Sequence, residues 1–229
     1  YVSTSVSLLN ADGTLCIDSL VNSGSAALDL VAALSGDVVL PSTPDPEGRV
    51  VLIDRYPHAV VSLVEADAPE VVSQLSVAMG FPSNPQDVAF LGDGRAYISR
   101  LTTNVSPSPD AGGLDAGGDL LIVDVALLEP IGRVALSAEP GFDPMPRHVV
   151  PLGDRVWVAL SHLSRDFSAA GPGRLLGVDP TTDEVASVMT LSGVENCSSA
   201  MAADDGRGLW VACSGLFSGA LVSQVEASG

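Results

Sequence analysis

The stretch Gly92-Asp-Gly-Arg-Ala-Tyr-Ile-Ser99 decides the fold, because the chain contains two further copies of it. The copies are Gly153-Asp-Arg-Val-Trp-Val-Ala159 and Asp205-Gly-Arg-Gly-Leu-Trp-Val-Ala212. Each is a tight turn that leads into a short apolar strand with an aromatic residue at its centre, and Gly and Asp suit such turns because they tolerate positive φ. Measured between the aromatic residues, the copies are 60 and 53 residues apart. The sequence is therefore built from repeats.

Weaker copies extend the repeat toward the start of the chain. Gly36-Asp-Val-Val-Leu-Pro-Ser42 aligns Val39 with Tyr97, and Tyr1-Val2-Ser3 matches Tyr97-Ile98-Ser99. A second phrase, in which a glycine and an apolar strand end at an aspartate, recurs at Gly48-Arg-Val-Val-Leu-Ile-Asp54, Gly118-Asp-Leu-Leu-Ile-Val-Asp124 and Gly173-Arg-Leu-Leu-Gly-Val-Asp179. No stretch has a convincing helical period.

Repeats of about 40–50 residues made of about four short strands are typical of propeller blades. We therefore predict an all-β fold, a β-propeller with about 4–5 visible blades. The expected blade-like units are 1–39, 40–97, 98–157, 158–210 and a partial unit at 211–229, which together form one propeller domain or a fragment of one. The final stretch, Gly219-Ala-Leu-Val-Ser-Gln-Val225, reads as the opening strand of another blade. A β-sandwich also has many short strands, but a β-sandwich would not require a repeated sequence motif.

The repeat resembles that of the YVTN-type, WD40-like β-propellers. The matching segments are Tyr97-Ile98-Ser99, Trp157-Val158-Ala159, Trp210-Val211-Ala212 and Asn84-Pro85-Gln86-Asp87-Val88-Ala89-Phe90. The resemblance implies a ring of about seven blades, of which this chain is a part, and a ligand site at one mouth of the central channel. The equivalent aromatic residues are expected to pack between blades.

Charge excludes several classes of partner. The chain has 28 acidic residues and 10 basic ones, all arginine, and a net charge of −18. Nucleic acids and anionic membrane surfaces repel such a chain. The absence of lysine excludes Schiff-base chemistry and a phosphate-binding lysine. No apolar run reaches the roughly 18 residues of a membrane span, so we expect no membrane insertion and no nucleic-acid partner.

The three cysteines bear on the cellular compartment. Cys197 and Cys213 lie 16 residues apart within one repeat, where neighbouring strands can bring them within disulfide distance, and Cys16 is left over. Buried free thiols are the alternative. We favour the disulfide. Together with the acidic charge, it suits an extracytoplasmic protein of the bacterial periplasm, the cell surface or the secreted class.

A glycine-rich loop at 102–118 offers a candidate cation site. Asp110, Asp115 and Asp119 supply carboxylates separated by glycines, which could bind calcium. The spacing differs from that of the EF-hand loop, and the alternative is a solvated insertion. No other metal motif and no cofactor motif is present, so we expect no cofactor.

The loops that enter the innermost strands of successive blades should converge at the channel mouth. They supply the candidate ligand-binding residues Asn84, Asp87, Arg147, His148 and Asn196, with Arg100 and His162 following the aromatic strands. On the functional interpretation Arg147 anchors an anion and either histidine acts as acid or base. On the structural interpretation, the Asn-Pro and Asp-Gly pairs shape turns, while Asp87 and the strand-end aspartates Asp54, Asp124 and Asp179 accept backbone N–H bonds that orient the blades.

Two functions follow. The first is a non-enzymatic, extracytoplasmic propeller that binds proteins or serves as a scaffold within a larger assembly; its oligomeric state is left open. The alternative is a lactonase-like hydrolase with a polar site at the channel mouth. An enzyme requires Arg147, His148 and His162 to converge on one cavity, whereas a scaffold does not.

Overall fold

The computed structural model describes residues 4–24, 33–65, 67–68, 72–216 and 221–226. Its regular structure consists of β-strands and one short 3-10 helix, η2 (Pro109–Ala111). The strands are β1 (Ser5–Leu9), β2 (Leu15–Asn22), β3 (Val38–Val39), β4 (Val50–Asp54), β5 (Val60–Val64), β6 (Val72–Ser76), β7 (Pro85–Phe90), β8 (Arg95–Thr103), β9 (Gly117–Asp124), β10 (Glu129–Ala135), β11 (Pro146–Leu152), β12 (Arg155–Leu160), β13 (Pro172–Asp179), β14 (Glu184–Glu195), β15 (Cys197–Ala202), β16 (Gly208–Cys213) and β17 (Leu221–Glu226). Among the described residues no helix is long and apolar enough to cross a membrane.

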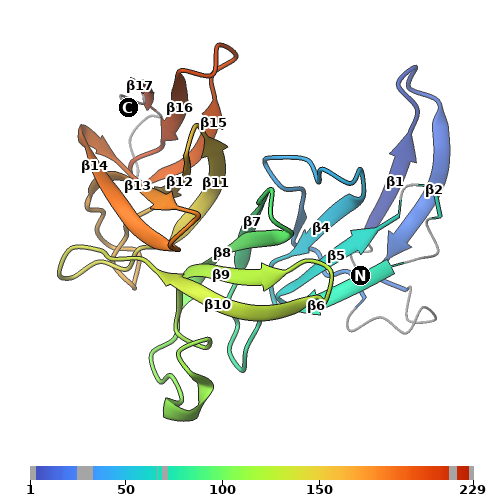
Figure 1. Ribbon diagram of the computed structural model, residues 1–229, viewed down its shortest axis with the longest axis horizontal. Helices are drawn as coiled ribbons and strands as arrows, with labels where there is room; N and C mark the ends of the chain where they lie inside the picture. Colours follow the sequence, from blue (N-terminus) through green and yellow to red (C-terminus); the bar gives the residue numbers. More distant parts are fainter. Residues whose placement is uncertain (1–3, 25–32, 66, 69–71, 217–220, 227–229) are drawn as a thin grey trace.

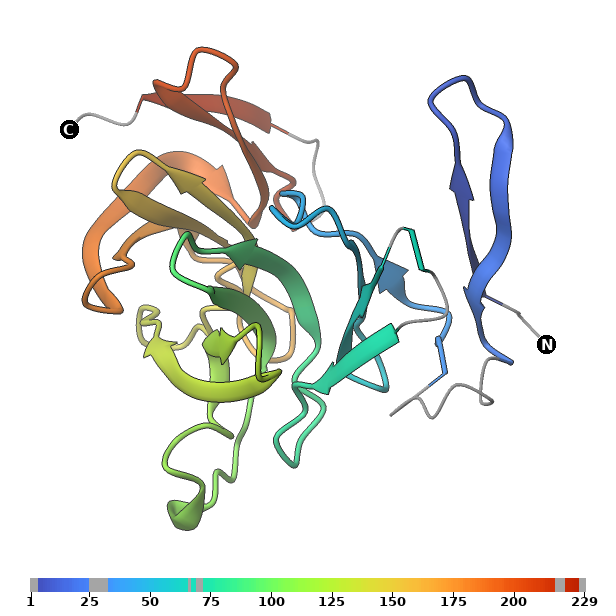
Figure 2. The same cartoon turned by 45° about the vertical axis from the view of Figure 1, so that its right-hand side comes forward.

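The strands form antiparallel sheets in which spatial order follows chain order. After the hairpin β1–β2 come the first sheet (β3–β6), the second sheet (β7–β10), the third sheet (β11–β14) and the three-stranded fourth sheet (β15–β17). The sheets follow one another along an open arc, with the hairpin at one end and the fourth sheet at the other (Figures 1 and 2). The fold is thus the all-β propeller that the repeats predict, with about 4–5 blades.

The sequence repeats were assigned to the wrong strand positions within the sheets in several places. Tyr97, Trp157 and Trp210 lie on the second strands β8, β12 and β16, so units counted between them cut each sheet in two. Val39 lies on β3, a first strand, and is not equivalent to Tyr97. Asp54 ends the second strand β4, whereas Asp124 and Asp179 end third strands.

Two further predictions concern segments near the ends of the chain. The segment that reads as an opening strand, β17, pairs with β16 as the third strand of the fourth sheet. The Tyr1–Ser3 copy lies outside the described residues.

Aliphatic cores lie between neighbouring sheets. Tyr97 is fully buried with Val158 between the second and third sheets, and Trp157 packs with Val211 between the third and fourth. These two aromatic residues therefore pack between blades, as predicted. Trp210 is not packed in this way. It is 42% exposed, because no described sheet follows the fourth. Trp210 therefore has no interblade partner in the described part of the chain.

Asp87 ties three consecutive sheets together. Its buried carboxylate accepts hydrogen bonds from the Ser42 N–H at 2.8 Å, from the Ser42 hydroxyl and from the Val149 N–H at 2.8 Å. Ser42 follows β3, Asp87 lies on β7 and Val149 lies on β11. Burial raises the pKa of Asp87, while these hydrogen bonds oppose the rise.

The equivalent position in the third sheet repeats this tie. His148 also lies two residues after the proline that begins its strand, and its Nδ1 lies 3.1 Å from the Ala200 carbonyl oxygen and 3.3 Å from the Ala200 amide nitrogen on β15. A polar side chain on β7 thus reaches the backbone of β11, and one on β11 reaches the backbone of β15, so both contacts constrain how neighbouring blades meet.

The second and third sheets are also tied at the opposite end of their strands. Arg95 donates to Asp183 at 2.7 Å and to the Pro180 carbonyl oxygen at 2.6 Å, and the Tyr97 hydroxyl donates to Asp183. Burial, reinforced by this carboxylate, raises the pKa of the Tyr97 phenol well above its ordinary value.

The expected disulfide is present. Cys197 and Cys213 are cross-strand partners on β15 and β16 and are joined by a disulfide, while Cys16 is an exposed free thiol on β2. The bridge closes the end of the fourth sheet at which β15 begins.

The two tryptophans provide a matched pair for testing the interblade cores. We expect Trp157→Ala to lower the free energy of unfolding by about 3–5 kcal/mol, because it empties a buried site. Trp210→Ala should lower it by about 1 kcal/mol or less, since its ring is partly solvated. Urea unfolding measures both. Equal losses would contradict the assignment of Trp157 to an interblade core.

Asp87 makes stability depend on pH in a defined direction. Because burial raises its folded-state pKa above 3.8, the folded protein holds this proton more readily than the unfolded chain. The contribution of Asp87 is therefore most favourable below pH 3.8 and falls as pH rises through the folded pKa. Asp87→Asn removes this dependence while keeping one acceptor oxygen. Urea unfolding midpoints across this pH range should show the wild type losing stability relative to Asp87→Asn as pH rises. A difference that stays constant with pH would contradict a raised pKa of the buried Asp87 carboxyl.

Candidate binding site

A polar network lies where the innermost strands begin. Gln86 and Arg147 occupy equivalent positions, each one residue after the proline that opens β7 or β11. Gln86 Nε2 donates to Asn84 Oδ1 at 2.7 Å, and Gln86 Oε1 accepts from Arg147 Nη1 at 2.7 Å and from Arg55 Nη1 at 3.4 Å. Gln86 thereby connects residues from the first, second and third sheets into one network.

Two guanidinium groups meet in this network. Arg55 is paired with Asp37, its Nε lying 2.9 Å from Oδ1. Arg147 is half-buried, and its Nε donates to the Ser161 hydroxyl at 3.1 Å. Burial and the neighbouring Arg55 lower the pKa of Arg147, while Asp37 opposes the shift. Within the described residues Arg147 has no carboxylate within 4.0 Å.

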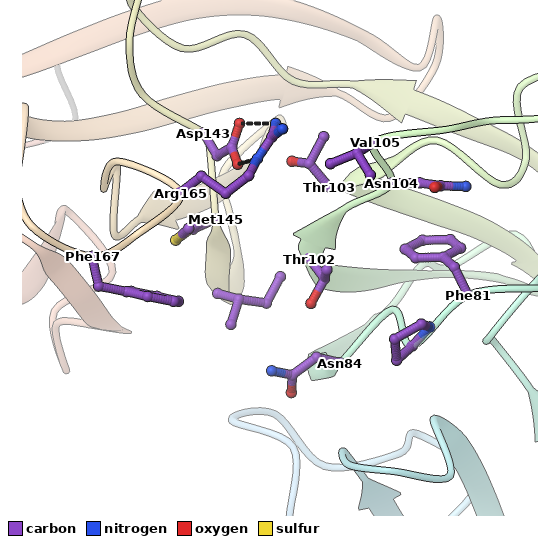
Figure 3. Close-up of a pocket in the computed structure, with 12 residues that line it drawn as sticks. Phe81, Asn84, Thr102, Thr103, Asn104, Val105, Asp143, Met145, Arg165 and Phe167 are labelled. Carbon is purple, nitrogen blue, oxygen red and sulfur yellow. Dashed lines mark hydrogen bonds and ion pairs between the residues drawn. The ribbon is translucent and has the colours of Figure 1, made fainter.

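A cavity of about 400 Å³ opens beside the network. Its lining is largely apolar: Phe81 and Phe167 lie on opposite sides, with Met145 and Thr102 between them (Figure 3). Asn84, the residue that Gln86 contacts, also lines it, so the cavity and the network share a wall.

The cavity is bordered by one ion pair and by loops from two blades. Arg165 donates to both oxygens of Asp143 at 3.0 and 3.1 Å, as Figure 3 shows. Residues 102–105 cover the end of β8 and the start of the loop after it, and Arg165 and Phe167 lie in the loop after β12. Equivalent regions of the second and third sheets thus face each other across the cavity. Pockets with an apolar body and a few polar groups are typical of ligand sites.

Arg100 is buried and paired with a carboxylate. Its guanidinium is fully enclosed and pairs with both oxygens of Asp119 at 2.8 and 2.7 Å. Its Cζ lies 5.5 Å from the centroid of the Phe81 ring. Arg100 thus supports the cavity wall from behind, and its Nη1 has no hydrogen-bond partner in the described part of the chain.

Neither His148 nor His162 lines the cavity, and neither is among the hydrogen-bond partners of Arg147. His162 is fully buried: its Nε2 accepts from the Glu139 N–H at 3.2 Å, and its Nδ1 faces the Pro172 carbonyl oxygen at 3.0 Å. A side chain at Gly171 would come within 2.6 Å of the imidazole, which is why glycine stands there. His148 is engaged with the backbone of the fourth sheet.

The remaining candidates have structural partners. Asn196, with a positive φ of 52°, donates to the Ser214 hydroxyl at 2.9 Å and to the Gly215 carbonyl oxygen at 3.0 Å. The strand-end aspartates cap turns: Asp124 accepts from the Leu127 N–H at 2.9 Å and Asp179 from the Thr181 N–H at 2.9 Å. Asp54 accepts from Ser35.

The carboxylates of the glycine-rich loop are not gathered into a set. Asp119 pairs with Arg100, the buried Asp115 accepts from the Ser108 N–H at 2.6 Å, and Asp110 is exposed at the start of η2. No group of three or more metal-ligating side chains occurs among the residues that the structure describes. The calcium candidate therefore finds no support in this geometry.

Sequence reasoning missed several residues of the site. Arg55, Gln86 and Ser161 all contact the network, and Phe81 and Phe167 form the cavity walls. One signal was available: Gln86 and Arg147 follow equivalent prolines in Asn84-Pro85-Gln86 and Met145-Pro146-Arg147.

Comparison with known proteins supports the fold. The chain is similar to hydrazine synthase of Kuenenia stuttgartiensis, with a TM-score of 0.62 and 12% identity over 91% of this chain and 49% of that one. Sqt1 of Saccharomyces cerevisiae matches with a TM-score of 0.57 and 10% identity over 94% of this chain and 50% of its own. The β-propeller domain of Myceliophteria thermophila Cps50 (Swd1) matches with a TM-score of 0.51 and 12% identity, over 75% and 47%.

These likenesses show the fold alone, because all are at 12% identity or below. The chain spans about half the length of these structures. No family model matches the sequence, so the YVTN-type repeat stays a resemblance. The chain has the propeller fold that it shares with these structures.

Proposed function

We propose that this chain is a non-enzymatic, extracytoplasmic propeller module that binds proteins as part of a larger assembly. The observation that carries the proposal is the position of the polar side chains. His162 uses both ring nitrogens on backbone groups, and His148 ties the third sheet to the fourth. The cavity beside the network is lined by neither histidine. A hydrolase of the lactonase kind would need them there.

The disulfide supports the location outside the cytoplasm. Disulfides persist in oxidising compartments and are rare where glutathione and thioredoxin reduce thiols. Cys197 and Cys213 lie at the start of β15 and the end of β16, and both are buried. This pairing is consistent with a periplasmic, cell-surface or secreted protein.

An uncovered sheet face supports the role in an assembly. Met201 and Trp210 are cross-strand partners on the fourth sheet and are 59% and 42% exposed. Tyr97 and Trp157 hold the equivalent position on their strands, and each is covered by the following sheet. The partner that fits this face is therefore another antiparallel sheet of the blade type, which would continue the same packing.

Site-specific photo-cross-linking tests this assembly face. We would replace Trp210 with p-benzoylphenylalanine and irradiate the protein in the cells that make it. Because the face has the register of an interblade surface, we expect cross-links to peptides with the alternating apolar pattern of a blade strand, identified by mass spectrometry.

The matched control is Leu127, which is 67% exposed on the turn between β9 and β10. A probe there should give few or no cross-links. Equal labelling at both positions, or none at Trp210, would contradict an assembly face on the fourth sheet.

A further inference from the structure

The chain's arginines show an unusual distribution of partners. The sequence contains 28 acidic residues for 10 arginines, so carboxylates are abundant. Within the described residues, eight arginines lie within 4.0 Å of a carboxylate: Arg49, Arg55, Arg95, Arg100, Arg133, Arg155, Arg165 and Arg207. Arg147 and Arg174 do not. Of these two, Arg147 belongs to the network at the channel mouth.

The surroundings of Arg147 make this lack of a carboxylate informative. It is partly desolvated, and a second guanidinium, Arg55, acts on it with like charge. Its hydrogen-bond partners, Gln86 and Ser161, are neutral. Asp37 is the carboxylate that favours the charge of Arg147, and Arg55 engages it. A half-buried cation whose hydrogen-bond partners are neutral is less well stabilised than a paired one, so such an arrangement persists where it serves binding.

The charge of the whole chain limits which anion fits. A net charge of −18 repels a dianion about twice as strongly as a monoanion. The chain has no lysine, and the residues that the structure describes form no long helix, so guanidinium groups are the cationic groups of the network. A planar carboxylate matches the guanidinium fork in two parallel hydrogen bonds.

The adjoining cavity adds an apolar requirement. Phe81, Met145 and Phe167 line it, and Phe167 is 52% exposed with a φ of 60°, a backbone conformation that a bulky residue rarely adopts. Asn84 connects this lining to Gln86 and so to Arg147. A ligand that reaches both places carries an apolar side chain close to its carboxylate.

We propose that Arg147 anchors the carboxylate of a peptide segment whose neighbouring apolar side chain enters the cavity between Phe81 and Phe167. The segment belongs to a protein partner, so this inference rests on the proposed function and specifies the chemistry that the mouth recognises. Arg55 supplies the second positive charge, and Gln86 holds both guanidinium groups in place.

Calorimetric titration of small probes tests the site on the wild-type chain. N-acetyl-phenylalanine carries both features, N-acetyl-phenylalaninamide lacks the charge, and N-acetylglycine lacks the side chain. We expect the first to bind with millimolar or better affinity, and each of the others at least about tenfold more weakly. An amide that binds as well as the acid, or no binding of the acid up to about 10 mM, would overturn the proposal.

Variants assign the binding to named residues. Arg147→Gln should weaken the binding of N-acetyl-phenylalanine at least about tenfold. Arg147→Lys should recover part of this affinity, because lysine keeps the positive charge without the planar guanidinium fork. Phe167→Ala should weaken the binding of N-acetyl-phenylalanine but leave the binding of N-acetylglycine unchanged. Arg207→Gln is the matched control, since this arginine side chain is 84% exposed and pairs with Asp205 in a turn. Equal effects of Arg147→Gln and Arg207→Gln would contradict the assignment.

Two further measurements keep the outcomes separate. Thermal unfolding of each variant shows whether it is folded, and the wild-type comparison of acid with amide needs no variant. Inorganic phosphate is titrated in parallel, and tighter binding of phosphate than of the acid would overturn the carboxylate assignment. Failure of these titrations leaves the cross-linking result at Trp210 unaffected, so the ligand chemistry and the assembly role are tested independently.

Discussion

The arrangement of the blades depends on the buried carboxylate of Asp87. It accepts hydrogen bonds from Ser42 of the first sheet and Val149 of the third while it lies on the second. Apolar packing between sheets has no preferred direction, whereas these hydrogen bonds require a particular distance and angle. The burial of one acid, with its cost in desolvation, therefore constrains how three blades meet.

The same principle explains why the mouth presents a defined set of groups. Gln86 and Asp87 are adjacent on β7, so the residue that orients the sheets stands next to the residue that holds Arg55 and Arg147. On β11, Arg147 is likewise adjacent to a residue that joins two sheets, because His148 contacts the backbone of Ala200 in the fourth sheet. On β7 and on β11, a side chain of the polar network thus alternates with one that joins blades, as the two-residue period of a strand requires.

The fold was predictable from sequence because the phrase around Tyr97, Trp157 and Trp210 repeats with its turn, whereas the phase of the repeat was not. The Asp54 and Asp124 phrases look alike, but a strand's place in a sheet depends on long-range pairing that its own residues do not encode. His162 illustrates the limit for the site. Its imidazole binds backbone groups of Glu139 and Pro172, which no local pattern reveals.

Arg147 could be selected from sequence as an anion anchor, yet its distinguishing property could not be seen there. In a chain this acidic every arginine is expected to find a carboxylate, and only the structure shows that Arg147 is bonded to neutral groups beside a second arginine. A scaffold that needed rigidity alone would gain by pairing or replacing that charge. Recognition explains this cation better, because blades joined by Asp87 and His148 hold it preorganised for the carboxylate that we propose as its ligand.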